Sequence, residues 1–323
     1  MAALVAIAAC RPAGGIERAE GFAQGTTYAA QWVSADVRGD VAAALEAELA
    51  RIDALLSNYR ADSAIERFNA ERTTARLDVP EEIVALVRAA ERVHAASDGC
   101  FDPTIRPLVA LWGFDGPEPS VPETAAIAET LGRVGLSRVH VLGDTALRKD
   151  AADVEVDVSG IAQGYTADRL AAVLESLGSE RYLVEIGGEI VARGRKPDGA
   201  PWRVAIETPQ PASGTAAIRV LTLPDERSAV ATSGTYQHFF SADGRRYAHV
   251  LDPRTGRPVE HALVSATVLH TDGALADAWS TALLCLGPDD AMRVATDEGL
   301  AAILFVERDG VLSEWRSPLA AVD

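Results

Sequence analysis

The order of strand-like and helix-like segments constrains the fold of this chain more than any other sequence feature. Apolar and acidic residues alternate across Val154–Val158 as in a half-buried strand, and apolar residues recur at helical spacing across Val41–Leu56. Elsewhere short apolar strands and helices are mixed, without the regular strand–helix–strand repeat of a parallel sheet. We therefore predict an α+β fold, formed as a single domain with two lobes.

Glycine and proline residues divide the rest of the chain into predicted elements. Pro80 begins a helix that ends near Gly99. Gly160–Gly164 forms a glycine-bounded loop before a helix at Tyr165–Leu177, and Pro209–Gly214 is a surface loop. The other predicted helices begin at Pro122 or span Ala274–Leu286 and Asp289–Glu298, and the other predicted strands are Thr27–Val33, Leu183–Ile186, Glu189–Ala192, Trp202–Ile206, Tyr247–Leu251, Leu263–Leu269 and Ala301–Val306.

The charge balance and the cysteines exclude several classes of protein. The 47 acidic and 30 basic residues give a formal net charge of −17, which repels nucleic acid, so we expect no DNA or RNA partner. Cys10, Cys100 and Cys285 permit at most one disulfide and no zinc cluster. We expect Cys100 and Cys285 to be buried, unpaired core residues.

The first residues resemble the processing site of a bacterial lipoprotein. Residues Ala2–Ala9 are apolar but fewer than the roughly 20 needed to span a bilayer. Ile7–Cys10 reads as an apolar residue, two small residues and a cysteine that can be acylated, and polar residues follow. We therefore predict a leader and tether in residues 1–20, a lipid anchor at Cys10 and a folded domain in residues 21–323. A frayed N-terminus is the alternative.

Two segments carry residues suited to binding phosphate and a metal ion. Asp157–Tyr165 runs from a strand through glycines into a helix, whose first backbone N–H groups attract anions, but its glycine spacing fits no common nucleotide motif. A plain tight turn is the alternative there. Asp277 and Thr281 are four residues apart on one face of a predicted helix and offer the oxygen ligands that Mg²⁺ prefers. The alternative is an Asp at the helix start and a Thr facing the core.

Three other short segments admit both a functional and a structural interpretation. His249 precedes an Asp-Pro turn and is a candidate general base, or a histidine that binds a nearby carbonyl. Phe101–Thr104 would suit either a ring-binding pocket or a packed loop, and Ser57–Tyr59 is equally ambiguous.

These segments, in this order, resemble the ApbE family of flavin transferases from about Gly25 to about Val306. Each motif is short, but their joint occurrence in order is specific. The matching motifs are Ser57–Tyr59 with Ser63, Ile65, Phe68 and Asn69; Gly99–Thr104 with Pro107, Leu108 and Leu111–Phe114; Asp157–Asp168; Gly187–Glu189; Trp202 with Val204 and Ile206; Thr232–Gly234; Tyr247–Gly256 with Pro258; and Ala276–Thr281.

The resemblance implies an enzyme with a T-fold-like arrangement that acts on FAD with Mg²⁺. Members of the family cleave FAD at its pyrophosphate and attach FMN through a phosphoester to a Thr or Ser hydroxyl of a target flavoprotein, releasing AMP. Some members hydrolyse FAD to FMN and AMP instead. Many are lipoproteins at the periplasmic or outer face of the cell envelope. An FAD pyrophosphatase and a non-catalytic FAD-binding lipoprotein are therefore the alternative functions.

The resemblance also assigns roles to individual residues. Asp277, Thr281 and the backbone carbonyl of Ala162 match the metal ligands of the family, and His249 matches a histidine that acts on the incoming hydroxyl. The residues that match flavin-nucleotide contacts are Gln24, Asn58, Tyr59, Asp102, Tyr165 and Leu251.

Four positions depart from the family pattern. Gln163 stands where a Lys is common, which removes a positive charge near the phosphates. Gln24 replaces a frequent Met, Ser159 a frequent Gly and Asn58 a frequent Thr. None of these departures removes a metal ligand.

Overall fold

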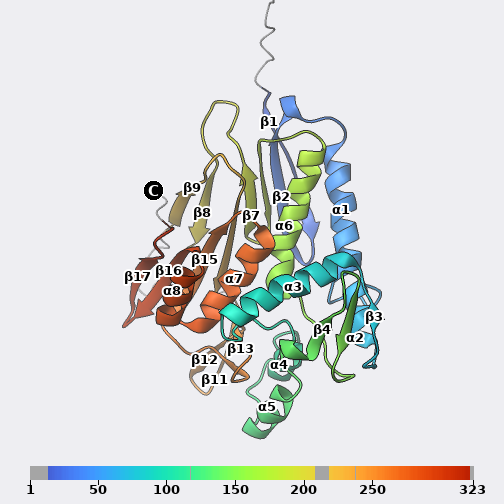
Figure 1. The fold of residues 1–323 in the computed structure, drawn as a ribbon. Helices are drawn as coiled ribbons and strands as arrows, with labels where there is room; N and C mark the ends of the chain where they lie inside the picture. Colours follow the sequence, from blue (N-terminus) through green and yellow to red (C-terminus); the bar gives the residue numbers. More distant parts are fainter. Residues whose placement is uncertain (1–13, 117, 208–217, 237, 321–323) are drawn as a thin grey trace, which may run out of the picture.

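The computed structural model describes residues 14–116, 118–207, 218–236 and 238–320 (Figure 1). Cys10 and the predicted loop Pro209–Gly214 lie outside these residues. The first strand begins at Ile16, so residues 16–20 of the expected tether belong to the folded domain. Within the described residues, no helix is long and apolar enough to cross a bilayer.

A single eight-stranded sheet forms the centre of the molecule. Each strand is antiparallel to its neighbours, so the α+β prediction is confirmed. Along the sheet the order of strands is β1 (Ile16–Ala23), β2 (Thr26–Val33), β6 (Tyr182–Ile186), β7 (Glu189–Arg193), β10 (Ser228–Gly234), β15 (Leu263–His270), β16 (Ala301–Arg308) and β17 (Val311–Arg316).

Helices cover one face of this sheet, and a hairpin covers the other. On the helical face α1 (Val41–Leu56) and α6 (Ser159–Ser176) run side by side, next to α7 (Gly273–Leu286) and α8 (Pro288–Asp297), while α3 (Glu81–Ala96) crosses in front of them (Figure 1). The hairpin of β8 (Arg203–Glu207) and β9 (Ile218–Thr222) buries its apolar side chains against the opposite face. Successive side chains of β6 point to opposite faces of the sheet, which explains the two covering layers. Val184 packs with the helices and Leu183 with the hairpin.

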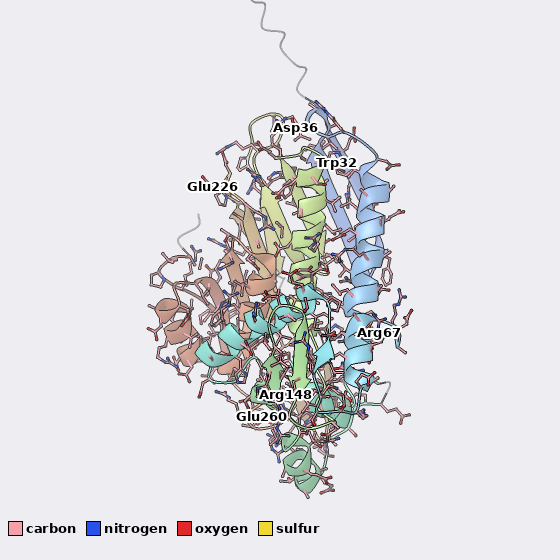
Figure 2. The ribbon with its side chains drawn as sticks, turned by 45° about the vertical axis from the view of Figure 1, so that its right-hand side comes forward. Trp32, Asp36, Arg67, Arg148, Glu226 and Glu260 are labelled. Carbon is pink, nitrogen blue, oxygen red and sulfur yellow. A yellow bond between two sulfur atoms is a disulfide. The ribbon has the colours of Figure 1, made fainter. Side chains whose placement is uncertain are left out.

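The remaining elements form a second group at one end of the sheet (Figure 1). Figure 2 places Asp36 at the far end of the molecule, and Arg148 and Glu260 toward this second group. The group contains the small sheet β3 (Leu77–Asp78), β5 (Ala146–Lys149) and β4 (Val139–Val141), the helices α2 (Ala64–Ala70), α4 (Arg106–Trp112) and α5 (Thr124–Leu131), and the hairpins β11 (Phe239–Ala242) with β12 (Arg245–Ala248) and β13 (Leu251–Asp252) with β14 (Arg257–Pro258).

Two predicted elements near residue 160 are wrong. Val154–Val158 shows the predicted alternation of burial but joins no sheet, because Asn69 satisfies the backbone N–H and C=O of Val156. The segment Gly160–Gly164 is helical, since α6 already begins at Ser159. Its glycines serve close packing between elements rather than a turn. The predicted strand Tyr247–Leu251 is also divided, between the ends of β12 and β13.

The expectation of unpaired cysteines is wrong as well. Cys100 and Cys285 form a disulfide, with their Cα atoms 5.6 Å apart. It joins the loop after α3 to the last turn of α7, across 185 residues of sequence. The carboxylate of Asp252 has an oxygen within 4.8 Å of both sulfur atoms, so β13 meets the same point.

Candidate active site

The site is built where α6 crosses α7, with their backbones in contact at Gly164 and Gly273. A Cβ on Gly164 would lie 2.0 Å from the carbonyl oxygen of Gly273, so only glycine permits this approach. One turn further along α6, Asp168 accepts hydrogen bonds from the backbone N–H groups of Gly273 and Ala274 at 2.8 and 3.1 Å. These bonds hold the first turn of α7 against α6, while Asp272 is the N-cap of α7 and accepts from the N–H of Leu275.

The predicted metal ligands meet along this crossing. Oδ2 of Asp277 accepts a hydrogen bond of 2.9 Å from the backbone N–H of Gly164. Thr281, one turn later in α7, places its hydroxyl 3.6 Å from where a Cβ of Gly160 would be. The shared face predicted for Asp277 and Thr281 thus lies against the first turns of α6, which contain Ala162. The carbonyl oxygen of Ala162 faces the same turns of α6 and accepts a hydrogen bond of 2.7 Å from the hydroxyl of Thr166.

The electrostatics of this crossing suit a cation. Asp277 is 5% exposed, and its burial raises the pKa of the carboxyl group above the ordinary value. Glu189 is 7% exposed; burial and then repulsion from Asp277 raise its pKa too, and its Oε2 has no hydrogen-bond partner. No Lys or Arg of the described ranges forms an ion pair with either carboxylate. The carboxylate of Asp277, the hydroxyl of Thr281 and the carbonyl oxygen of Ala162 are the oxygen donors that Mg²⁺ prefers, so these residues fit that ion.

A cavity of about 220 Å³ opens beside the N-terminus of α6. Its lining includes Gln24, Asn58, Tyr59 and Ala162, four of the residues predicted to contact the nucleotide or the metal. The ring of Tyr59 is 89% exposed and available for stacking. The N-terminus of α6 lies beside this region, where the carboxylate of Asp157 accepts a hydrogen bond of 2.8 Å from the first helical N–H, that of Ser159.

Local hydrogen bonds hold the cavity wall. Gln24 lies at the tip of the β1–β2 hairpin with a φ of 52°, and its amide donates to the hydroxyl of Thr166 at 3.0 Å. The amide nitrogen of Asn58 donates to Asp157 at 2.7 Å and to Ser159 at 3.0 Å. Its Oδ1 is buried without a partner and remains able to accept a hydrogen bond.

Two predicted contact residues make their hydrogen bonds inside the protein. Asp102 is 6% exposed and accepts from the hydroxyl and N–H of Thr104 and from the N–H of Leu136 at 2.6 to 2.9 Å. The hydroxyl of Tyr165 donates to Glu82 of α3; burial and this carboxylate raise the pKa of the phenol. In this structure the polar groups of both residues are therefore bonded to the protein itself.

His249 lies in the turn between β12 and β13, apart from the cavity lining. Its Nδ1 is 3.0 Å from the carbonyl oxygen of His238, so that nitrogen carries the proton and Nε2 is the acceptor in the neutral ring. Burial lowers the pKa of His249, which keeps the ring neutral near pH 7. Leu251, two residues later, is 4% exposed and packs with Trp112 and Tyr247.

Sequence reasoning missed three features of the site. These are the buried carboxylate of Glu189, the hydrogen bonds from the first turn of α7 to Asp168 and the contact of Gly164 with Gly273. The signal for Glu189 was present, because an acidic residue follows two glycines and begins an apolar strand. Nothing local marks the other two, since both depend on a contact between distant helices.

Comparisons with known proteins agree on one family. The model of the ApbE family matches residues 24–304. The chain is 39% identical to an FAD:protein FMN transferase of Klebsiella pneumoniae, over 85% of this chain and 79% of that protein. It is 38% identical to one of Salmonella typhimurium, over 93% and 87%.

Solved structures give the same result. The apo crystal structure of the Pseudomonas stutzeri flavinyl transferase ApbE superposes with a TM-score of 0.86 at 38% identity, covering 94% of this chain and 95% of that one. The flavin transferase ApbE from Vibrio cholerae gives 0.86 at 33%, covering 94% and 97%. These matches confirm the predicted resemblance, and the chain therefore belongs to the ApbE family and is an enzyme of the transferase class.

Proposed function

We propose that this protein is a Mg²⁺-dependent FAD:protein FMN transferase. It would cleave the pyrophosphate of FAD, attach FMN through a phosphoester to a Thr or Ser hydroxyl of a target flavoprotein, and release AMP. The observation that carries the proposal is the crossing of α6 and α7, where Asp277, Thr281 and Ala162 adjoin a cavity with an exposed Tyr59. Curated relatives at 38 to 39% identity are named FAD:protein FMN transferases.

The residues around the cavity would bind and orient the dinucleotide. Tyr59 supplies a stacking face for a flat ring, and the N-terminus of α6 would lie next to the diphosphate. Asp277, Thr281 and the carbonyl of Ala162 would hold Mg²⁺, which neutralises charge on the pyrophosphate when bound. Because the chain is strongly acidic, these local groups rather than long-range steering attract FAD.

His249 would accept the proton of the incoming hydroxyl. The acceptor oxygen forms a bond to the phosphorus of the FMN moiety, the bond from that phosphorus to the AMP oxygen breaks, and Nε2 takes the hydroxyl proton. The carbonyl of His238 holds the proton on Nδ1, and the lowered pKa leaves Nε2 free at neutral pH.

The direct test follows both products of the reaction. The full chain is incubated with FAD and Mg²⁺, with and without an acceptor protein that exposes a Thr, and AMP and covalent flavin on a denaturing gel are measured. Acceptor-dependent covalent flavin is the expected result. AMP without covalent flavin would replace the proposal by an FAD pyrophosphatase, and tight FAD binding without either product by a flavin-binding protein.

The role of His249 predicts a specific loss. His249→Gln should lower the transfer rate about 10² to 10⁴-fold, because the general base is removed while the fold is kept. In the wild type the rate should fall only below the ordinary histidine pKa, since burial lowers the pKa of His249. His140→Gln, at a histidine bonded to Asp150 on the surface, is the control. A native rate in the His249 variant would contradict the assignment.

We also propose that the enzyme works in the cell envelope, anchored through Cys10. The Cys100–Cys285 disulfide supports an exported protein, because disulfides persist in oxidising compartments. Stable anchoring needs more than one acyl chain at Cys10. Fractionation tests this: Cys10→Ala should move the protein from the membrane pellet to the soluble fraction, and an unchanged distribution would exclude the anchor.

A further inference from the structure

Glu189 enters the helix layer at the crossing of α6 and α7. It is the first residue of β7, after the turn at Gly187 and Gly188, and it pairs with Ile186. Side chains alternate along a strand, so Glu189 faces the same way as Val191. Val191 packs in the apolar cluster that contains Ala167 of α6 and Ala276 of α7, next to Asp277.

The carboxylate of Glu189 lacks the partners that a buried charge requires. It is 7% exposed, and its Oε2 makes no hydrogen bond. No basic residue in the described part of the chain pairs with it, and the charged groups that act on it are the carboxylates of Asp277 and Glu185. A buried carboxylate with one oxygen unpartnered and no counter-charge is costly, so it indicates a ligand that the carboxylate meets in function.

Helix α6 closes over the turn that precedes Glu189. A Cβ on Gly187 would lie 2.5 Å from Nε2 of Gln163, so the Gln163 side chain rests on this turn. Gln163 also lines the cavity, next to Ala162. The neighbouring Gly164 donates its N–H to Asp277. One turn of α6 therefore contacts the hairpin that holds Glu189, the cavity and Asp277.

We propose that Glu189 is a second carboxylate of the cation site and shares the bound ion with Asp277. This inference rests on the proposed metal dependence. With both carboxylates ionised, the site carries two negative charges before the nucleotide arrives. Such a site favours a divalent over a monovalent cation and retains the ion in the absence of FAD.

The chain offers a matched control on the same hairpin. Glu185 lies one strand away, its Oε1 accepts from the N–H of Gly188 at 2.8 Å, and alternation directs it to the opposite face of the sheet. Glu189→Gln removes the charge and keeps the size of the side chain. Glu185→Gln makes the same change outside the site.

The test measures binding of Mg²⁺ to the full chain without FAD by titration calorimetry, and of Mn²⁺ by electron paramagnetic resonance. Glu189→Gln should weaken both ions about tenfold or more, without lowering the melting temperature of the metal-free protein. Glu185→Gln should bind both ions as the wild type does. Should Glu189→Gln fail to fold, Glu189→Asp keeps the charge and should still change the Mn²⁺ spectrum.

The outcomes separate this inference from the proposed function. If Glu189→Gln binds Mg²⁺ as the wild type does while Asp277→Asn loses binding, the role of Glu189 is overturned and the transferase proposal stands. If the wild type binds neither ion, with or without FAD, the metal dependence itself is refuted. An unchanged Mn²⁺ spectrum in Glu189→Asp would also overturn the inference.

Discussion

Acidic residues on one side of helix α6 are paired with arginines, whereas those on the other side have no basic partner among the described residues. Toward α1 and α3 lies a charged seam of Glu48, Arg51, Glu82, Tyr165 and Arg169, in which Arg51 donates to both glutamates at 2.7 to 2.9 Å. Toward α7 and β7 lies an acidic junction of Gly164, Asp277 and Glu189, in which no basic side chain of the described residues meets either acid.

The pKa shifts on the two sides run in opposite directions. In the charged seam, hydrogen bonds from Arg51 lower the pKa of Glu48 and of Glu82 below the usual value. In the acidic junction, burial raises the pKa of Asp277 and of Glu189. A paired carboxylate contributes to stability, whereas an unpaired buried one lowers stability and persists for function. The comparison therefore separates the side of α6 that stabilises the fold from the side that forms the candidate site.

The largest expected effect comes from adding a methyl group at Gly164, in the acidic junction. In Gly164→Ala the new methyl group would meet the backbone of Gly273, so we expect the free energy of unfolding to fall by about 3 kcal/mol or more. In an open helix the same change would stabilise by about 1 kcal/mol. Gly15→Ala, with nothing within 4 Å of the new Cβ, is the control. Urea unfolding that finds both variants equally stable would refute the close contact.

Removing the charge from the junction should stabilise the metal-free protein. Asp277→Asn keeps an acceptor for the N–H of Gly164 and removes a buried carboxylate, so we expect a gain of about 1 kcal/mol without metal. The stabilisation of the wild type by Mg²⁺ should disappear in the variant. Melting curves with and without Mg²⁺ measure both effects. A variant less stable than the wild type without metal would show that the charge is compensated after all.

The smallest expected effect lies in the charged seam. Glu82→Gln should cost about 0.5 kcal/mol at neutral pH, because the side chain of Glu82 is 34% exposed and its ion pair is screened. Since Arg51 lowers the pKa of Glu82, this stability is present above the usual value of 4.5 and is lost as the pH falls through the lower value in the folded state. Urea unfolding at about pH 7 and about pH 3 should show the difference shrinking, and a constant difference would exclude the ion pair.

Local patterns predicted the elements that carry the site. The four-residue spacing of Asp277 and Thr281 was enough to place both on one face of α7, because helical periodicity is a property of neighbouring residues. Tyr59 lies exposed beside the cavity, and its role as a stacking face stays a prediction.

Local sequence patterns could not predict contacts between segments that are distant in the sequence. The sequence around Cys100 and Cys285 contains no sign of their pairing, which depends on where α7 ends against the loop after α3. The glycines of α6 suggested a loop because glycine is common in turns, whereas here glycine allows two helices to touch. Asp102 looked available to a ligand, but Thr104 of the same loop donates to its Oδ1 and the N–H of Leu136 donates to its Oδ2.

The disulfide has a consequence for how the chain matures. The covalent ring between Cys100 and Cys285 contains most of the domain, so it restricts the unfolded chain by about 5 kcal/mol in the chain-entropy model. A ribosome makes residue 100 long before residue 285, and the first thiol must wait for its partner. Oxidation therefore comes late in biogenesis, and it locks the loop of Asp102 to the helix of Asp277 only after both have been synthesised.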